Sequence, residues 1–275
     1  MKIGILFEGN PNNPGGFNQA LQSAININEI SNKNNTVEFV VFNKDSLDTL
    51  ELKKIKVKKF KFNFFSKIYN FLYNFQSFKN LIVNYKIKHP FSKFIEKHKY
   101  ELMVFLSPHE LSLHCGEVNF IVNIWDIDHK KNNPFPEHKK NHIFLKKEFF
   151  LNYILFHSYK IIVSEKQTKN ELIEMYKCDK NKIEVQPFIS ILPRHYENEK
   201  GENINYSNIF DNLNLPKDKK IIFYPSTFWA HKNHKYVLDT AHILKSKKNY
   251  DFFFVFVGQD KGNLNFIAES IKKLE

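Results

Sequence analysis

The sequence predicts an α/β protein in which helices cover both faces of a parallel sheet. Short apolar runs rich in β-branched residues alternate along the chain with stretches of helical spacing, and this alternation is typical of parallel sheets. The length of 275 residues and the hydrophobic content of 42% provide enough material for a sizeable core. They suit one large domain or two small ones.

The first 193 residues hold most of the predicted strands. Apolar runs predict strands at residues 2–7, 36–42, 55–62, 101–106, 119–125, 160–164 and 182–188. The run at 55–62 alternates apolar residues with lysines, as a half-exposed strand does. Near-helical spacing predicts a helix over residues 17–30, with these apolar positions: Phe17, Leu21, Ala24, Ile25 and Ile27.

A polar stretch separates this part from a second α/β pattern. Residues 194–219 contain Gly201, Pro216 and several asparagines, which indicates a linker. The pattern then restarts with a strand at 221–224, a helix at 233–245, a strand at 252–257 and a helix at 263–274. We expect a Rossmann-like domain over 1–193, a linker over 194–219, and the truncated beginning of a second domain over 220–275, because a doubly wound half needs more strands.

The chain is basic, since 41 Lys and Arg against 29 Asp and Glu give a net charge of +12. This excess suits nucleic acid, an anionic membrane surface or a phosphorylated substrate, although AT-rich coding would also raise lysine together with asparagine, isoleucine and phenylalanine. No nucleic-acid-binding module is recognisable, so we expect no nucleic-acid partner. The two cysteines exclude a disulfide scaffold. With no signal peptide and no segment apolar enough to span a bilayer, the sequence indicates a cytoplasmic protein.

Residues 64–99 form a basic and aromatic stretch with two explanations. A helix of this kind could rest peripherally on anionic lipid, or it could pack on the sheet with its lysines facing water. We favour packing on the sheet, because most amphipathic helices of soluble proteins face a core. The apolar residues that follow the 4-3 spacing are Phe64, Ile68, Phe71, Phe75, Phe78, Ile82 and Tyr85.

The loop after the first predicted strand is rich in glycine and asparagine and leads into a helix. Gly15 and Gly16 would let an anion approach the backbone at the helix start, where free N–H groups and the helix dipole favour negative charge. The loop is neither a GxGxxG fingerprint nor a P-loop. The alternative is an ordinary turn between strand and helix.

A second polar segment follows the predicted strand at 119–125. Asp126, Asp128 and His129 lie at the carboxyl end of that strand, where open α/β sheets bind ligands. His129 could hydrogen-bond a substrate hydroxyl or act as an acid or base near neutral pH. The alternative is a helix cap formed by an aspartate, beside a solvated histidine.

Two further segments follow the predicted strands of the C-terminal part. The first, residues 224–234, opens a helix with Lys232, and a cation there suits a diphosphate better than it suits the helix dipole. The second places Gly258 at a strand end, where a nucleotide would find room. The alternatives are a basic first turn of a surface helix and a plain turn.

The twelve histidines raise the question of a metal site. His138 and His142 are four residues apart, and His231 and His234 are three apart. Neither pair has the HExxH pattern or a third ligand nearby in sequence. We therefore expect no metal.

Taken in order, these segments resemble glycosyltransferase family 4, of the type called glycosyl transferases group 1. The family segment Trp-Asp-x-x-His followed by Pro-x-Phe-Pro-Glu is similar to residues 125–137, with one residue fewer before Phe135. The segment Tyr-Pro-x-x-Phe-Trp-x-His-Lys-Asn-His is similar to residues 224–234. Residues 258–263 and the pair Gly15-Gly16 also fit, so the resemblance covers nearly the whole chain.

The resemblance implies a GT-B fold, in which an N-terminal Rossmann-like domain holds the acceptor and a C-terminal one holds a UDP- or GDP-linked sugar. It implies retaining sugar transfer to a polysaccharide or lipid-linked acceptor, without metal or cofactor. Asp126 and His129 would line the sugar site as catalytic residues, and Lys232 would neutralise the diphosphate. The residues implied to bind the donor are Gly15, Gly16, His231, Lys232, Asn233 and Gly258.

The sequence departs from the family in two ways. Thr227 stands where many members have an arginine, and the later acidic motif with two glutamates seven residues apart is absent. We therefore expect an N-terminal portion of an enzyme that associates through an unfinished sheet edge. A sugar-nucleotide epimerase, a phosphorylase and a non-catalytic carbohydrate-binding protein are the alternatives.

Overall fold

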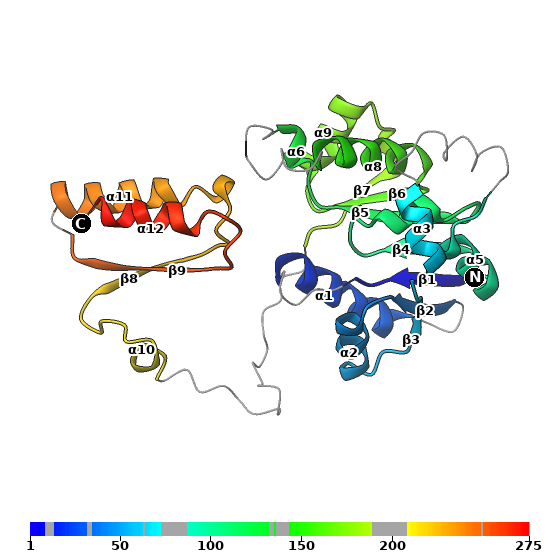
Figure 1. The fold of residues 1–275 in the computed structure, drawn as a ribbon, viewed down its shortest axis with the longest axis horizontal. Coiled ribbons are helices and arrows are strands. Elements are labelled where there is room, and N and C mark those ends of the chain that lie inside the picture. The colour runs from blue at the N-terminus through cyan, green and yellow to red at the C-terminus, as the bar shows by residue number, and fades with distance from the viewer. Residues whose placement is uncertain are drawn as a thin grey trace. The chain divides into compact units, whose positions relative to one another are not determined.

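The computed structural model describes residues 1–8, 14–31, 35–62, 64–72, 87–131, 135, 143–188, 208–248 and 250–274 (Figure 1). The chain forms two compact units. The first comprises residues 1–128 and 145–192, and the second comprises residues 129–144 and 193–275. The predicted boundaries at 193 and 219 stay predictions, because residues 189–207 lie outside the described part.

The first unit is built on a seven-stranded sheet in which every strand pair is parallel. Its strand order is β3-β2-β1-β4-β5-β6-β7, which reverses direction between β1 and β4. The predicted class of fold is thereby confirmed. The strands are β1 (Lys2–Leu6), β2 (Thr36–Val41), β3 (Val57–Lys59), β4 (Leu102–Phe105), β5 (Asn119–Ile124), β6 (Lys160–Val163) and β7 (Ile183–Val185).

Helices lie on both faces of this sheet (Figure 1). Two of them, α1 and α2, cover one face, and α5, α8 and α9 cover the other. The helical segments are α1 (Pro14–Ile30), α2 (Lys44–Leu52), α3 (Phe64–Leu72), α5 (Pro90–His98), η1 (Glu110–His114), α6 (Asp128–Lys131), α8 (Ile143–His157), α9 (Lys166–Tyr176) and η3 (Lys180–Lys182).

The apolar strands bury side chains on both faces because successive residues point in opposite directions. In β1, Ile5 joins the core under α1 and α2, whereas Leu6 joins the core under α5, α8 and α9. In β2, Phe39 likewise joins the core under α1 and α2, and Val40 joins the core on the opposite face. The sheet therefore separates two hydrophobic layers, and its polar groups emerge at the strand ends.

The amphipathic stretch at 64–99 differs from the single packed helix that we favoured. Its described residues form two helices, α3 and α5. His89 caps α5 by accepting a hydrogen bond from the Phe91 N–H, and Pro90 occupies the first turn, as is common at helix starts. The apolar side chains of α3 at Phe64, Ile68 and Phe71 are exposed, so the described part of the stripe does not pack on the sheet as we predicted. Residues 73–86 lie outside the described part.

The second unit contains a two-stranded parallel sheet of β8 (Lys220–Pro225) and β9 (Phe252–Val257). The helices α11 (His234–Lys248) and α12 (Leu264–Lys272) pack on it, around a core of Phe228, Leu238 and Ile267. The predicted strand–helix–strand–helix order is therefore present. The segment predicted as a linker contains a short helix, α10 (Ile209–Asn212), and a further turn, η4 (Ala230–Lys232), precedes α11.

Candidate functional site

The chain order of the first sheet reverses between β1 and β4, and ligands of open α/β sheets bind outside the strand ends at such a point. Glu8 lies two residues beyond the end of β1, and His109 lies in the turn after β4. The Nε2 atom of His109 is 3.2 Å from Oε2 of Glu8. Sequence reasoning overlooked this pair, because the two residues are 101 positions apart and belong to no motif.

The surroundings of His109 determine which ring nitrogen carries its proton and whether the ring is charged. Its Nδ1 accepts a hydrogen bond from the Leu111 N–H, so the proton of a neutral ring lies on Nε2, the nitrogen nearer Glu8. Burial lowers the pKa of His109 to about 4, and burial followed by the charge of Glu110 raises the pKa of Glu8. Because burial keeps the imidazole neutral at neutral pH, its 3.2 Å contact with Glu8 does not join two opposite charges.

A cavity of about 320 Å³ opens beside this edge, between α1 and the ends of β4 to β7. Its polar side chains are amides and hydroxyls, and no charged residue lines it within the described ranges. Trp125 and Phe188 supply aromatic surface. Such a lining is suited to a neutral, hydroxyl-rich ligand. The polar lining residues are Gln19, Ser23, Asn26, Asn123, Ser164 and Gln186.

Gly16 makes room for the indole that lines this cavity. A Cβ atom at Gly16 would lie 2.3 Å from Cη2 of Trp125, whereas a Cβ atom at Gly15 would meet nothing within 4 Å. Both glycines lie in the first turn of α1. The close approach that Gly16 permits is thus made by Trp125, and the predicted approach of an anion to either glycine stays a prediction.

Asp126 and His129 follow β5 as predicted, but their surroundings differ. Asp126 is exposed, and its Oδ1 accepts a hydrogen bond from the Asp128 N–H at 3.0 Å, as a cap does. His129 is only 2% exposed, and its ring lies 5.7 Å from that of Phe144. His129 is therefore not the solvated histidine of the alternative. The segment's Pro134, Pro136 and Glu137 lie outside the described residues, as does the His138–His142 pair.

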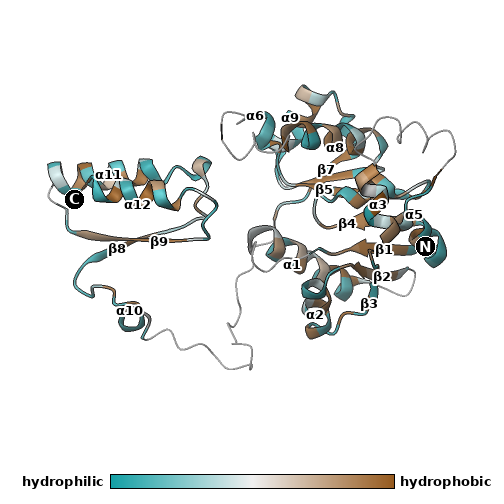
Figure 2. Cartoon of the chain, viewed as in Figure 1, coloured by the Kyte–Doolittle hydropathy of each residue, from teal (hydrophilic) through white to brown (hydrophobic). Residues whose placement is uncertain are grey.

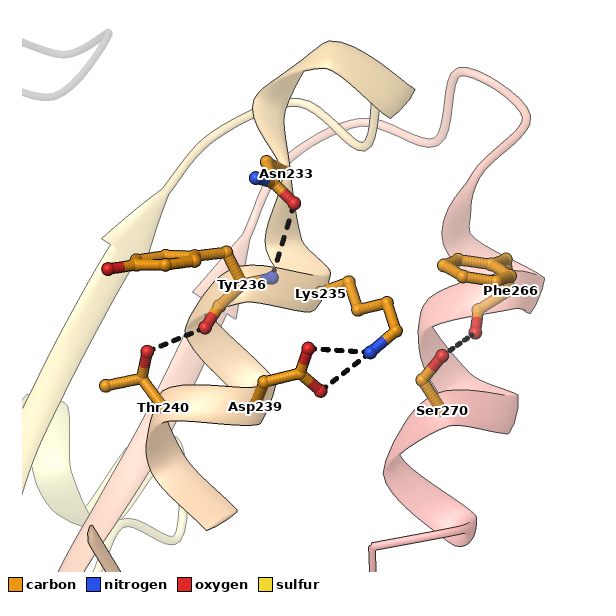
Figure 3. Close-up of polar contacts among 7 residues, drawn as sticks. All are labelled: Asn233, Lys235, Tyr236, Asp239, Thr240, Phe266 and Ser270. Atoms are coloured by element: carbon orange, nitrogen blue, oxygen red, sulfur yellow. Dashed lines mark hydrogen bonds and ion pairs between the residues drawn. The ribbon is translucent and has the colours of Figure 1, made fainter. Parts of the chain in front are cut away.

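In the second unit, three predicted donor-binding residues lie on the turn between β8 and α11. The Tyr224 hydroxyl donates a hydrogen bond of 2.7 Å to the Lys232 carbonyl, which ties the turn to the strand. The Lys232 side chain is exposed. Asn233 adopts a left-handed conformation with φ of 50°, and its Oδ1 accepts from the Tyr236 N–H at 3.3 Å (Figure 3). Asn233 thereby caps α11 and leaves the turn beside Lys232 well defined.

Aromatic rings surround His231. The ring of Trp229 is nearly parallel to it at 6.3 Å, and the ring of Phe135 meets it edge-on at 6.0 Å. Phe135 comes from the proline-rich part of the Trp125–Glu137 segment. Two segments singled out from the sequence therefore meet within the second unit.

The absence of a side chain at Gly258 allows the loops after β8 and β9 to pack closely against each other. A Cβ atom there would lie 2.1 Å from the Ser226 carbonyl oxygen and 2.9 Å from the Thr227 Cα. The Phe228 N–H donates to the Gln259 carbonyl across the same contact. Asp260 then accepts backbone N–H bonds from Gly262 and Leu264, and these bonds lower the pKa of Asp260. The space at Gly258 is filled by backbone, as in the plain-turn alternative.

His234, the first residue of α11, is fully buried among aromatic rings. Its ring lies 4.9 Å from that of Phe228 and 5.1 Å from that of Tyr224. Burial lowers its pKa, an effect that the Ser226 backbone opposes. His234 therefore belongs to the core that supports the turn.

Among the residues that the structure describes, no group of three or more His, Cys, Asp or Glu is placed to hold a metal ion. The expectation of a metal-free protein stays a prediction. No helix within the described ranges has the length and apolarity needed to cross a membrane.

Solved structures with the same arrangement define the class of fold. A glycosyltransferase from Rickettsia africae ESF-5 matches with a TM-score of 0.56 and 17% identity, over 99% of this chain and 64% of that one. The lipopolysaccharide outer core galactosyltransferase WaaB matches with a TM-score of 0.52 and 13% identity, over 100% and 65%. A UDP-GlcNAc 2-epimerase from Neisseria meningitidis, bound to UDP-GlcNAc, matches with a TM-score of 0.50 and 15% identity, over 100% and 70%.

These likenesses show an α/β fold of the GT-B type, and the chain spans less than two thirds of the length of the first two structures. Residues 205–275 match the family described as "Glycosyl transferases group 1". This match contains the turn with Lys232 and the loop with Gly258. No curated protein sequence matches the chain.

Proposed function

We propose that the chain is part of a family 4 glycosyltransferase, which moves a sugar from UDP or GDP to a polysaccharide or lipid-linked acceptor with retained anomeric configuration. The observation that carries this proposal is the family match over residues 205–275. Within that stretch the turn between β8 and α11 presents an exposed lysine at the start of a fifteen-residue helix. The proposed work takes place in the cytoplasm as part of polysaccharide synthesis.

The donor side of the proposal is electrostatic. In the reaction, the bond from the anomeric carbon to the diphosphate oxygen breaks, and a bond to an acceptor hydroxyl oxygen forms. The departing diphosphate gains negative charge, which a lysine ammonium and helix N–H groups stabilise. We assign this task to Lys232 and the start of α11, with His231, Asn233 and Gly258 shaping the turn around it.

The acceptor side of the proposal lies in the first unit. The cavity beside Trp125 offers neutral hydrogen-bonding groups and aromatic surface, which suit a sugar better than a phosphate. The Glu8–His109 pair lies at the strand ends where such folds bind ligands. We keep the proposed roles of the remaining residues: Gly15 and Gly16 in donor binding, and Asp126 and His129 in the sugar site. Because His129 is buried, it would act on a sugar only after its cover moves.

An epimerase that acts on a nucleotide sugar is the second candidate, because one matching structure is a UDP-GlcNAc 2-epimerase. The two functions differ in their products. A transferase leaves a nucleoside diphosphate and a lengthened acceptor, whereas an epimerase leaves the altered sugar. The match over residues 205–275 to the group 1 family favours transfer.

The test is product analysis after incubation with panels of UDP- and GDP-sugars and carbohydrate acceptors. We expect release of UDP or GDP together with an acceptor that has gained one sugar in the donor's anomeric configuration. Conversion of the donor sugar without acceptor would favour epimerisation. A lengthened acceptor with inverted configuration would contradict the retaining mechanism, and binding without turnover would favour a carbohydrate-binding protein.

A further inference from the structure

The positive charge of the chain is concentrated in one segment. Residues 52–95 contain eleven lysines and no arginine, aspartate or glutamate. Of the net charge of +12, +11 therefore comes from this segment, and the remaining residues are nearly balanced. Lysines also occur throughout the rest of the chain, so what sets this segment apart is that no acidic residue balances its lysines.

The lysines of this segment that the structure describes before and within α3 face solvent. They follow α2, run along the edge strand β3, and continue into α3, where Lys67 is also exposed. Their exposed ammonium groups create a positive potential over this region. The lysines are Lys53, Lys54, Lys56, Lys58, Lys59, Lys61 and Lys67.

The helix α3 turns its small and polar side inward. Ser66 is fully buried, and Tyr69 is 7% exposed, with its ring 4.8 Å from that of His89. Residues three apart lie on one face of a helix, so this face is the attachment of α3 to the first unit. Apolar residues on the opposite face cannot also reach the core.

The outward side of α3 is aromatic. Phe64, Phe65 and Phe71 are 72%, 71% and 65% exposed, and Ile68 is 37% exposed. Figure 2 shows α3 with much of its length in the apolar colour. An exposed cluster of large apolar side chains next to lysines is the pattern of a helix that enters a lipid interface.

We propose that α3 docks the first unit on an anionic membrane surface. Phe64 and Phe65 insert among the acyl chains, and the lysines from Lys53 to Lys67 contact the anionic headgroups. Each interfacial lysine and each inserted phenylalanine adds to the affinity for such a surface. The inference does not depend on the proposed sugar transfer.

Lipid is favoured over nucleic acid by the aromatic side of α3. Nucleic-acid binding would use the same lysines and lose affinity with salt in the same way. It would not require three outward phenylalanines beside one another on a helix, since bases stack on aromatic rings held in a groove or on a sheet. The phenylalanines therefore provide the discriminating test.

The experiment measures sedimentation of the whole chain with vesicles of phosphatidylcholine, with and without phosphatidylglycerol, at low and high salt. We expect binding to anionic vesicles at ~50 mM salt and its loss at ~500 mM salt. The double variant Phe64→Ser, Phe65→Ser and the triple variant Lys59→Glu, Lys61→Glu, Lys67→Glu should each bind at least about tenfold more weakly. Matched controls on α11, Tyr236→Ser and the pair Lys245→Glu, Lys247→Glu, should bind like the wild type.

A second measurement reports membrane insertion directly, so a loss of folding stability in a variant cannot imitate its result. An environment-sensitive fluorophore on Phe65→Cys should brighten and shift to shorter wavelength with anionic vesicles, whereas the same label on Tyr236→Cys should not. The chain's own Cys115 and Cys178 are buried, which favours selective labelling. The proposal is overturned by absent sedimentation at low salt, by undiminished binding of the phenylalanine variant, or by tighter binding to single-stranded RNA than to the vesicles.

Discussion

At the scale of single residues, buried histidines connect the fold of the first unit to pH. His89 and His109 each accept a backbone N–H bond through Nδ1, and a protonated ring cannot accept it. The rings of His89 and His114 are stacked at 4.0 Å. Burial lowers the pKa of His89 to about 4, and burial followed by the charge of His89 lowers the pKa of His114 to about 3.

We predict that the first unit loses stability as the pH falls below 6.5. The folded state keeps these histidines neutral while the unfolded state takes up protons, so each costs about 1.4 kcal/mol per pH unit between 6.5 and its folded pKa. The raised pKa of Glu8 acts in the opposite direction at acid pH. Urea unfolding between pH 7 and pH 5 measures the slope. His89→Asn keeps a capping side chain and should flatten it, whereas exposed His242→Asn should not. Equal stability at both pH values would contradict the prediction.

A second residue-scale prediction concerns the two glycines at the start of α1. Gly16→Ala should destabilise the first unit by about 1–3 kcal/mol, because its methyl group would displace the Trp125 indole. Gly15→Ala is the matched control, since its Cβ atom enters open space and removes freedom from the unfolded chain, a gain of up to ~1 kcal/mol. Thermal unfolding with tryptophan fluorescence checks both. Two variants of equal stability would show that Trp125 moves freely.

At the scale of elements, the loops after β8 and β9 depend on each other. Gly258→Ala should separate them, because the added atom would collide with three backbone atoms rather than with a flexible side chain. We expect a cost above about 3 kcal/mol and faster proteolysis of α11 and α12 than in the wild type. Wild-type cleavage kinetics would mean that the two loops are not in contact in solution.

The sequence allowed the strands to be located well and some helices poorly. The strands follow from apolar runs that the sheet buries on both faces. No helix was predicted at α8, because phenylalanines and leucines surround it on nearly every side, including the exposed Leu145 and Phe156. The polar α2 and α9 each bury only two residues, too few to show a period. In α3 the period was seen, but its apolar side faces outward.

The candidate site was predictable where polar residues directly follow a strand in the sequence. His231, Lys232 and Asn233 lie on one turn after β8, as their order suggested. The Glu8–His109 contact was not predictable, because it needs the strand order of the folded sheet. The burial of His129 was not predictable either. The ring of Phe144, which lies near that of His129, comes from a residue 15 positions further along the chain.

At the scale of the whole molecule, the second unit should cause self-association. The side chains of Phe223, Phe253 and Val257 on β8 and β9 are exposed, and parallel strands are ordinarily covered on both faces. We expect analytical ultracentrifugation to show association that grows with concentration and decreases in the double variant Phe223→Ser, Phe253→Ser. Tyr236→Ser, which replaces an exposed aromatic residue on α11, should leave it unchanged. A stable monomer at high concentration would contradict this prediction.

We propose that the turn after β8 serves a nucleotide-sugar transferase. Its most direct test is the rate at which labelled sugar passes from a UDP- or GDP-sugar to a carbohydrate acceptor, for the wild type, Lys232→Ala and the exposed control Lys245→Ala. We predict transfer that Lys232→Ala reduces about 10²-fold, because one electrostatic contact to the departing diphosphate is lost, and that Lys245→Ala leaves unchanged. Transfer that proceeds at the wild-type rate in Lys232→Ala would contradict this proposal.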